Sequence, residues 1–188
     1  MTVFDLRLVS LAALLAVVGC SPSWLTLVQS GPPSALAGAP AFDVAFDFSR
    51  MIIDGQPVEQ LMHTMPPDEH ADLEGAFVEM QRVFLEELAA QSGVPVQQAN
   101  GPPAPGTLRL TVIFTMVQRG PRGPIGFSST EVTSEAQWSL NGQLTDRASM
   151  TRTSSPSFLR PRVAQRMKIC AGELAGLTAR FFESEQNR

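Results

Sequence analysis

Apolar and polar residues alternate along three stretches of this chain with a period of two, as the faces of half-buried strands require. The first stretch covers residues 42–48, where phenylalanines and a valine alternate with aspartates and an alanine. The second covers residues 107–117, and one of its faces carries Leu108, Leu110, Val112, Phe114 and Met116. The third covers residues 131–140. Each stretch is predicted to form a strand.

The third stretch ends in the pair Asn141-Gly142, which is the strongest short-range signal for a β-hairpin. Both positions of a type I′ turn take a positive φ, which Asn and Gly adopt more readily than other residues. A returning strand is therefore predicted over residues 143–153.

Two longer segments repeat their apolar residues every three or four positions, which predicts amphipathic helices. The first helix is expected to begin at Pro66-Pro67 and to end at Ser92-Gly93. Its apolar stripe consists of Leu73, Phe77, Met80, Phe84 and Leu88. The second helix begins near Pro161, and its stripe consists of Val163, Met167, Cys170, Leu174, Leu177 and Phe181. Small residues in the second helix, such as Gly172 and Gly176, would allow a close approach to a neighbouring element.

These elements follow one another in the order β-α-β-β-β-α. The sequence therefore predicts an α+β fold, an antiparallel sheet of three to five strands with two amphipathic helices packed on one face. Residues 94–106 and 118–126 are rich in proline and glycine and are predicted to be loops.

The N-terminal part of the chain carries the pattern of an export signal. Arg7 precedes an apolar run over residues 8–18, which has the length of the central region of a signal peptide and is shorter than the roughly 20 residues of a membrane span. The run ends in Val17-Val18-Gly19-Cys20. This tetrad resembles the lipobox of bacterial lipoproteins.

The resemblance implies that residues 1–19 are removed and that Cys20 becomes a lipidated N-terminus, with a diacylglyceryl group on its sulfur and an acylated amine. Two or more acyl chains anchor a protein stably, whereas one holds only marginally. Ser21 after the cysteine implies the periplasmic side of the outer membrane. The alternative is an uncleaved signal anchor over residues 8–28, and both interpretations place the rest of the chain outside the cytoplasm.

Residues 29–41 are rich in Pro, Gly, Ala and Ser, a composition typical of linkers. We expect them to be poorly ordered and to hold the folded part away from the bilayer. The predicted organisation is therefore a signal peptide at 1–19, a lipidated cysteine and tether at 20–41, and a single α+β domain at 42–188.

The charge distribution bears on binding to nucleic acid, and the cysteine content bears on disulfide bonds. The net charge is −4, and the acidic residues concentrate in residues 41–100 and the basic ones in residues 101–170. Such a balance, in an exported chain, argues against binding to nucleic acid. With Cys20 lipidated, Cys170 has no partner for an intramolecular disulfide.

Residues that could carry chemistry are few. Cys170 lies within the apolar stripe of the second helix, where a small buried hydrophobe is expected rather than a nucleophile. His63 and His70 are the only histidines, and they lie on opposite sides of Pro66-Pro67, which is not the spacing with which a helix binds zinc. The sequence thus predicts no catalytic residues, no metal site and no cofactor.

A basic cluster at the start of the second helix consists of Arg160, Arg162, Arg166 and Lys168. The dipole of a helix disfavours cations at this end, so something should offset their charge. Either they pair with acids of the first helix, with Glu79, Glu86 and Glu87 as candidates, or they contact anionic head groups or an acidic partner.

The predicted element order, behind a lipobox, resembles several families of small envelope lipoproteins, including the lipopolysaccharide-assembly lipoprotein. We therefore predict a lipid-anchored, non-enzymatic envelope protein that binds another envelope component, a protein or an amphiphile, as an accessory to assembly or transport. One alternative is a periplasmic hydrolase or metal-dependent enzyme that uses His63 or His70. Another is a carrier with an apolar groove between helices and sheet.

Overall fold

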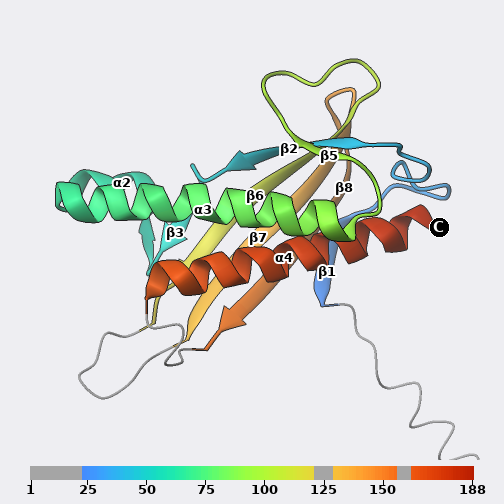
Figure 1. The fold of residues 1–188 in the computed structure, drawn as a ribbon. Helices are drawn as coiled ribbons and strands as arrows, with labels where there is room; N and C mark the ends of the chain where they lie inside the picture. The colour runs from blue at the N-terminus through green and yellow to red at the C-terminus, as the bar shows by residue number, and fades with distance from the viewer. Residues whose placement is uncertain (1–22, 121–128, 156–161) are drawn as a thin grey trace, which may run out of the picture.

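The computed structural model of the chain describes residues 23–120, 129–155 and 162–188. Three helices and eight strands lie within these ranges (Figure 1). In chain order they are β1 (Trp24–Val28), β2 (Phe42–Asp47), β3 (Ile52–Ile53), β4 (Gln56–Pro57), α2 (Val58–Thr64), α3 (Pro67–Gln91), β5 (Val96–Gln98), β6 (Leu108–Gln118), β7 (Thr130–Leu140), β8 (Gln143–Ser154) and α4 (Val163–Gln186).

The strands form one mixed sheet in the order β1-β8-β7-β6-β2-β5, with β3 beside β6 and β4 beside β3. The pairs β1–β8, β8–β7, β7–β6 and β3–β4 are antiparallel, whereas β2 runs parallel to both β5 and β6, and β3 parallel to β6. The predicted antiparallel sheet of three to five strands with two helices is therefore wrong. The reason is the connection between β2 and β6, which contains α3, because a crossover of this length lets two neighbouring strands run in the same direction.

The strongest sequence signals correspond to elements that the structure contains. Helix α3 starts at Pro67 and stops just before Ser92, as its proline start and its Ser-Gly stop predict. Asn141 and Gly142 have φ values of 53° and 78°, so the predicted hairpin turn between β7 and β8 is confirmed. The elements missing from the prediction are β1, α2 and the short strands β4 and β5.

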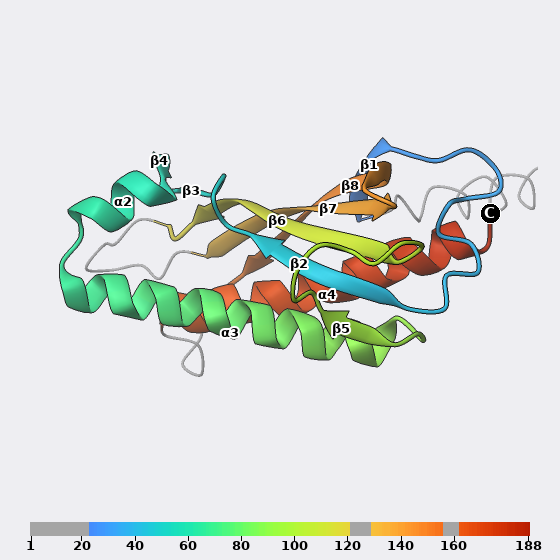
Figure 2. The ribbon, with the colours of Figure 1, turned by 90° about the horizontal axis from the view of Figure 1, so that it is seen from above.

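Both long helices pack on the same face of the sheet, and the core lies between them and the strands (Figure 2). Strand β6 contains a bulge between Phe114 and Met116. The bulge reverses the alternation, so Val117 is buried where the period-two pattern predicts Met116. Glycines bring the helices close, because a Cβ at Gly172 would lie 3.2 Å from Val83 Cγ1 of α3. The expected role of the small residues in α4 is thus confirmed.

The segment predicted to be a tether is part of the folded body. Strand β1 pairs with β8, with Trp24 opposite Met150, and the following residues carry Ser34 and Leu36 into buried positions. The folded region therefore begins at β1 rather than at residue 42. The predicted signal peptide and Cys20 lie outside the described residues.

Within the described ranges, no helix combines the length and apolar character that crossing a membrane would require.

Candidate functional site

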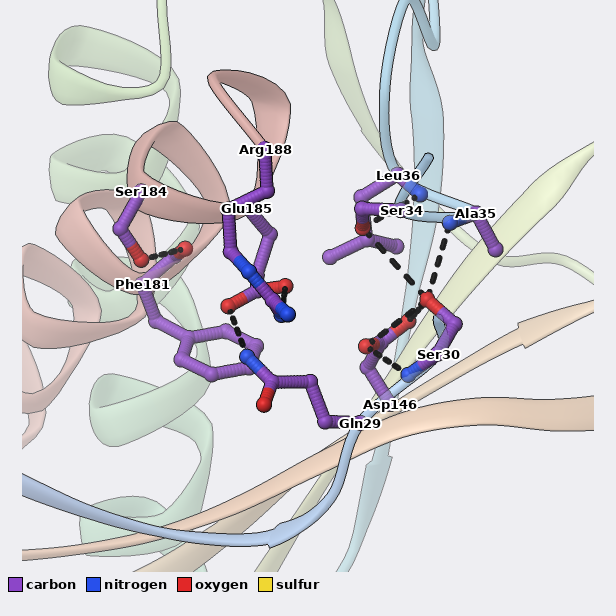
Figure 3. A network of polar contacts seen from close by, with 10 residues as sticks. All are labelled: Gln29, Ser30, Ser34, Ala35, Leu36, Asp146, Phe181, Ser184, Glu185 and Arg188. Carbon is purple, nitrogen blue, oxygen red and sulfur yellow. Dashed lines mark hydrogen bonds and ion pairs between the residues drawn. The ribbon is translucent and has the colours of Figure 1, made fainter. Parts of the chain in front are cut away.

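The chain that follows the lipobox-like tetrad is fixed to the body by a network of hydrogen bonds around Asp146 (Figure 3). Asp146 lies on β8 and is fully buried. The backbone N–H of Ser30 donates to Asp146 Oδ1 at 2.9 Å, and Ser30 Oγ lies 3.1 and 3.0 Å from the two carboxylate oxygens. Ser30 is thus held to β8 through both its backbone N–H and its hydroxyl group.

The same serine shapes the turn after it. Ser30 Oγ accepts a hydrogen bond from the backbone N–H of Ala35 at 2.9 Å, and Ser34 Oγ accepts one from the N–H of Leu36 at 3.2 Å. These bonds satisfy backbone groups that would otherwise be buried without partners. They also place the Leu36 side chain in the core, where it is fully buried.

A second connection joins this segment to the C-terminal helix. Gln29 Nε2 donates to Glu185 Oε1 at 2.7 Å, and Arg188 Nη1 donates to the other oxygen of the same carboxylate at 2.8 Å (Figure 3). The Trp24 ring packs edge-on against Phe181, with 5.9 Å between centroids. The N-terminal segment is therefore attached to both β8 and α4.

The basic cluster predicted at the start of α4 does not form one surface. Arg166 is buried and donates from Nε to Thr130 Oγ1 at 2.8 Å. Lys168 Nζ pairs with Glu79 Oε2 of α3 at 3.1 Å, which is one of the pairings that the sequence suggests. Arg162 is exposed, and Arg160 lies outside the described residues.

Glu79 on α3 pairs with two cations, Arg82 of its own helix and Lys168 of α4. Hydrogen bonds from Arg82, and next from Lys168, lower the pKa of the Glu79 carboxyl to about 2. The pairs that Glu79 makes stabilise the fold when the pH is above the ordinary pKa of a glutamate, and this stabilisation is lost as the pH falls toward 2. Because all three side chains are exposed to solvent, the pairs contribute little to stability.

Two grooves open on the helical side of the body. The first, of about 540 Å³, runs along α3 and α4 and is lined by Glu87, Gln91, Arg152, Gly172, Glu173 and Gly176, among others. The second, of about 480 Å³, lies between the N-terminal parts of α3 and α4. Its apolar lining comes from Met65, Leu73, Ala76, Val163, Ala164 and Met167, and its charged rim from Glu69, Asp72, Arg119 and Arg162. The second groove thus offers both an apolar wall and the exposed Arg162.

The histidines lie on different helices. His63 is exposed on α2, and His70 on α3 has its Nδ1 3.7 Å from Glu74 Oε2. Among the residues that the structure describes, no three or more His, Cys, Asp or Glu side chains are grouped so that they could hold a metal ion.

Cys170 is buried, and its thiol donates a weak hydrogen bond to the carbonyl oxygen of Thr130 at 3.7 Å. Burial raises the pKa of this thiol to about 11, with a smaller contribution from the charge of Glu173. In the folded protein the thiol therefore stays protonated at neutral pH and is a poor nucleophile.

We expect Cys170 to be inert toward a thiol reagent such as dithionitrobenzoate at pH 8 and to react once the protein unfolds. The measurement is the absorbance change with and without denaturant in a Cys20→Ser background, which leaves a single thiol. Between pH 9 and 11 the Cys170 thiol is ionised in the unfolded chain but still protonated in the folded protein. Its ionisation therefore lowers the free energy of unfolding as the pH rises through this range. Rapid labelling of the native protein would show that Cys170 is accessible and would contradict its buried position.

The network around Asp146 is the feature that sequence reasoning missed. A signal for it exists, because position 146 falls on the same face of β8 as the buried Ala148 and Met150. An acid on the core face of a strand needs a buried hydrogen-bond partner. The partner, Ser30, could not be located in the sequence, since it lies 116 residues away in a segment of linker-like composition.

No family model and no curated protein sequence matches this chain. Among solved structures, it is similar to a PelC dodecamer from Paraburkholderia phytofirmans, with 16% identity, a TM-score of 0.43, and coverage of 81% of this chain and 97% of that one. It is also similar to a DUF330 protein from Xanthomonas campestris, with 10% identity, a TM-score of 0.39, and coverage of 87% and 94%.

Proposed function

We propose that this protein is a lipid-anchored, non-enzymatic component of the cell envelope that binds another envelope component, a protein or an amphiphile, as an accessory to its assembly or transport. The observation that carries the proposal is the tetrad Val17-Val18-Gly19-Cys20, which ends four residues before β1. Ser21 after the cysteine favours the periplasmic side of the outer membrane as the site of attachment.

The way in which the N-terminal segment is held supports a role at a membrane surface. The buried carboxylate of Asp146 and the carboxylate of Glu185 both bind this segment, through Ser30 and Gln29. A lipid at Cys20 would therefore lie only four positions ahead of a strand that is part of the folded body. So short a separation limits which surfaces of the body can lie near the bilayer and which are presented to a partner.

The groove between the N-terminal parts of α3 and α4 is our candidate for the binding surface. Methionine, leucine, valine and alanine side chains line it, and the exposed Arg162 stands at its rim. An apolar wall with charged groups of both signs beside it, Glu69 and Asp72 as well as Arg162, suits a ligand with an apolar part and a polar or charged end. This combination favours an amphiphile or an amphipathic segment over a wholly polar ligand.

Cys20→Ser is expected to abolish membrane attachment. The variant should move from the detergent-soluble membrane fraction to the soluble periplasmic fraction, because acyl chains supply the anchoring free energy at about 0.8 kcal/mol per buried methylene. Intact-mass analysis of the natural protein should show a chain that begins at Cys20 with added acyl groups. Cys170→Ser is the matched control and should remain in the membrane fraction.

The fractionation of Cys20→Ser can also contradict the proposed lipid anchor. If Cys20→Ser stays in the membrane fraction as firmly as the natural protein, the lipid anchor is wrong, and an uncleaved apolar segment ahead of β1 becomes the better explanation. Crosslinking of the natural protein in its membrane before extraction tests the binding role. An Arg162→Glu variant that loses its adduct would support the groove, whereas an unchanged adduct would exclude Arg162 from the contact.

A further inference from the structure

Strand β1 exposes apolar side chains at the end of the sheet. Its five residues, Trp24–Val28, include no charged side chain. Leu25 is 64% exposed and Leu27 is 39% exposed, so one short strand carries two of the five large exposed hydrophobic residues in the described part of the chain. Single exposed apolar residues are common on protein surfaces, but a grouping of them marks an interaction site.

The direction of the Leu25 side chain follows from the pairing of β1 with β8. Trp24 lies opposite Met150 and packs against Phe181 of α4, so its side chain is on the helical face of the sheet. Side chains alternate along a strand, which places Leu25, opposite Ser149, on the other face. Figure 2 shows that this face is not covered by α3 or α4.

The outer edge of β1 lacks most of the usual protection of an end strand. In the described residues β1 pairs with β8 alone, which leaves its other edge without a neighbouring strand. Folded proteins usually protect such an edge with charges, prolines or bulges. Strand β1 has a bulge between Thr26 and Val28 but neither a charge nor a proline. An uncharged apolar end strand of this kind is expected to be covered by something.

The length of the chain ahead of β1 identifies what covers it. Leu25 follows Cys20 by five residues, and five extended residues span at most about 18 Å. Residues on the C-terminal side are held as well, because Ser30 is bound to the buried Asp146. If Cys20 carries acyl chains, β1 cannot leave the neighbourhood of the bilayer to which those chains belong.

We infer that β1 lies against the membrane and that Leu25 and Leu27 enter the interfacial region of the bilayer beside the lipid on Cys20. This inference rests on the proposed function, since it takes the lipid anchor as given. The apolar strand and the acyl chains then act together as two attachments to one surface. The body is thereby oriented with its β1 edge toward the membrane and with the groove at Arg162 free to meet a partner.

The test uses the natural lipidated protein in vesicles of phosphatidylethanolamine and phosphatidylglycerol. Leu25→Cys is labelled with nitrobenzoxadiazole, a fluorophore that brightens in apolar surroundings, and doxyl-labelled lipids serve as the quencher. Val78→Cys is the matched control, because Val78 is 63% exposed, as Leu25 is, but lies on α3. Buried Cys170 is expected to remain unlabelled.

We expect the label at position 25 to be quenched by the doxyl lipids roughly twofold or more above the label at position 78, and to shift its emission to the blue. Adding Leu27→Ser should reduce the quenching at position 25. Equal quenching at the two positions, with the protein still bound to the vesicles, would overturn the orientation while leaving the lipid anchor intact. The lipid anchor is tested separately with the single variant Cys20→Ser, which should no longer bind the vesicles.

A second copy of this chain is the other possible cover for the β1 edge, and the same variants distinguish it. If two β1 strands pair with each other, Leu25→Cys should form disulfide-linked dimers in detergent, without any bilayer. Dimers of this kind, together with quenching no greater than that of the Val78 control, would exclude contact between β1 and the membrane.

Discussion

Asp146→Ala is expected to lower the free energy of unfolding by about 3 kcal/mol, because removing a buried acceptor leaves its donors without partners. The two donors are the backbone N–H and the hydroxyl of Ser30. The loss should be measured by urea unfolding in the Cys20→Ser background, which avoids detergent. Hydrogen exchange should show the earliest loss of protection in β1 and in residues 29–36, since the network holds that segment to β8.

Two further variants make this prediction specific. Asp146→Asn keeps an acceptor for Ser30 and should cost less than Asp146→Ala. Ser149→Ala lies on the opposite face of the same strand and should change the stability by about 0.5 kcal/mol or less. If Asp146→Ala and Ser149→Ala proved equally mild, the carboxylate would not be what holds the N-terminal segment.

The second large effect is expected for Trp138→Ala, at about 3–5 kcal/mol. Trp138 is among the largest fully buried side chains, and its ring centroid lies 4.8 Å from that of Phe42 and 5.2 Å from that of Phe182. It therefore joins β7 to β2 and to α4. Truncation would leave a cavity between three elements that cannot all close onto it, and thermal unfolding would record the loss as a lower Tm.

Trp138→Phe is expected to be far milder, at about 1 kcal/mol, because a phenyl ring keeps the aromatic contacts. The indole also carries a buried Nε1 that has no hydrogen-bond partner, and phenylalanine removes that unsatisfied group. If Trp138→Phe cost as much as Trp138→Ala, the stability would come from the indole itself rather than from stacking, and an unseen partner for Nε1 would be required.

Local sequence signals were sufficient for the elements whose stability is mainly local. Helix α3 has its proline start, its apolar stripe and its Ser-Gly stop within one continuous segment, and the turn at Asn141 and Gly142 depends on those two residues. The alternation along β6 failed at Ile113, which is buried as well as its neighbours, and after Phe114, where a bulge inserted one residue. Such a bulge responds to pairing with β7, which a single-strand pattern does not record.

The N-terminal segment shows the limit of composition as a guide. Residues 29–41 have the makeup of a linker, yet Leu36 packs in the core and Ser30 meets a carboxylate from a distant strand. Proline and glycine indicate that a segment lacks regular structure, and this is correct here. They do not indicate that it lacks tertiary partners, because those partners are supplied by residues more than a hundred positions away.

The basic cluster at the start of α4 illustrates the same point for candidate sites. Four neighbouring cations predict a single surface, but the helix turns successive side chains in different directions. Arg166 therefore enters the body and Lys168 reaches α3, while Arg162 remains at the groove. Which of them could meet a ligand depended on the packing of α4 against its neighbours.

The pairing of β1 with β8 also has a consequence for the order of folding. Trp24 pairs with Met150, and Gln29 bonds to a glutamate 156 residues further along the chain. Loops of this length close late, because distant partners must first be brought together. The first strand of the described chain is thus among the last to be docked, and β1 remains exposed until the C-terminal helix has formed.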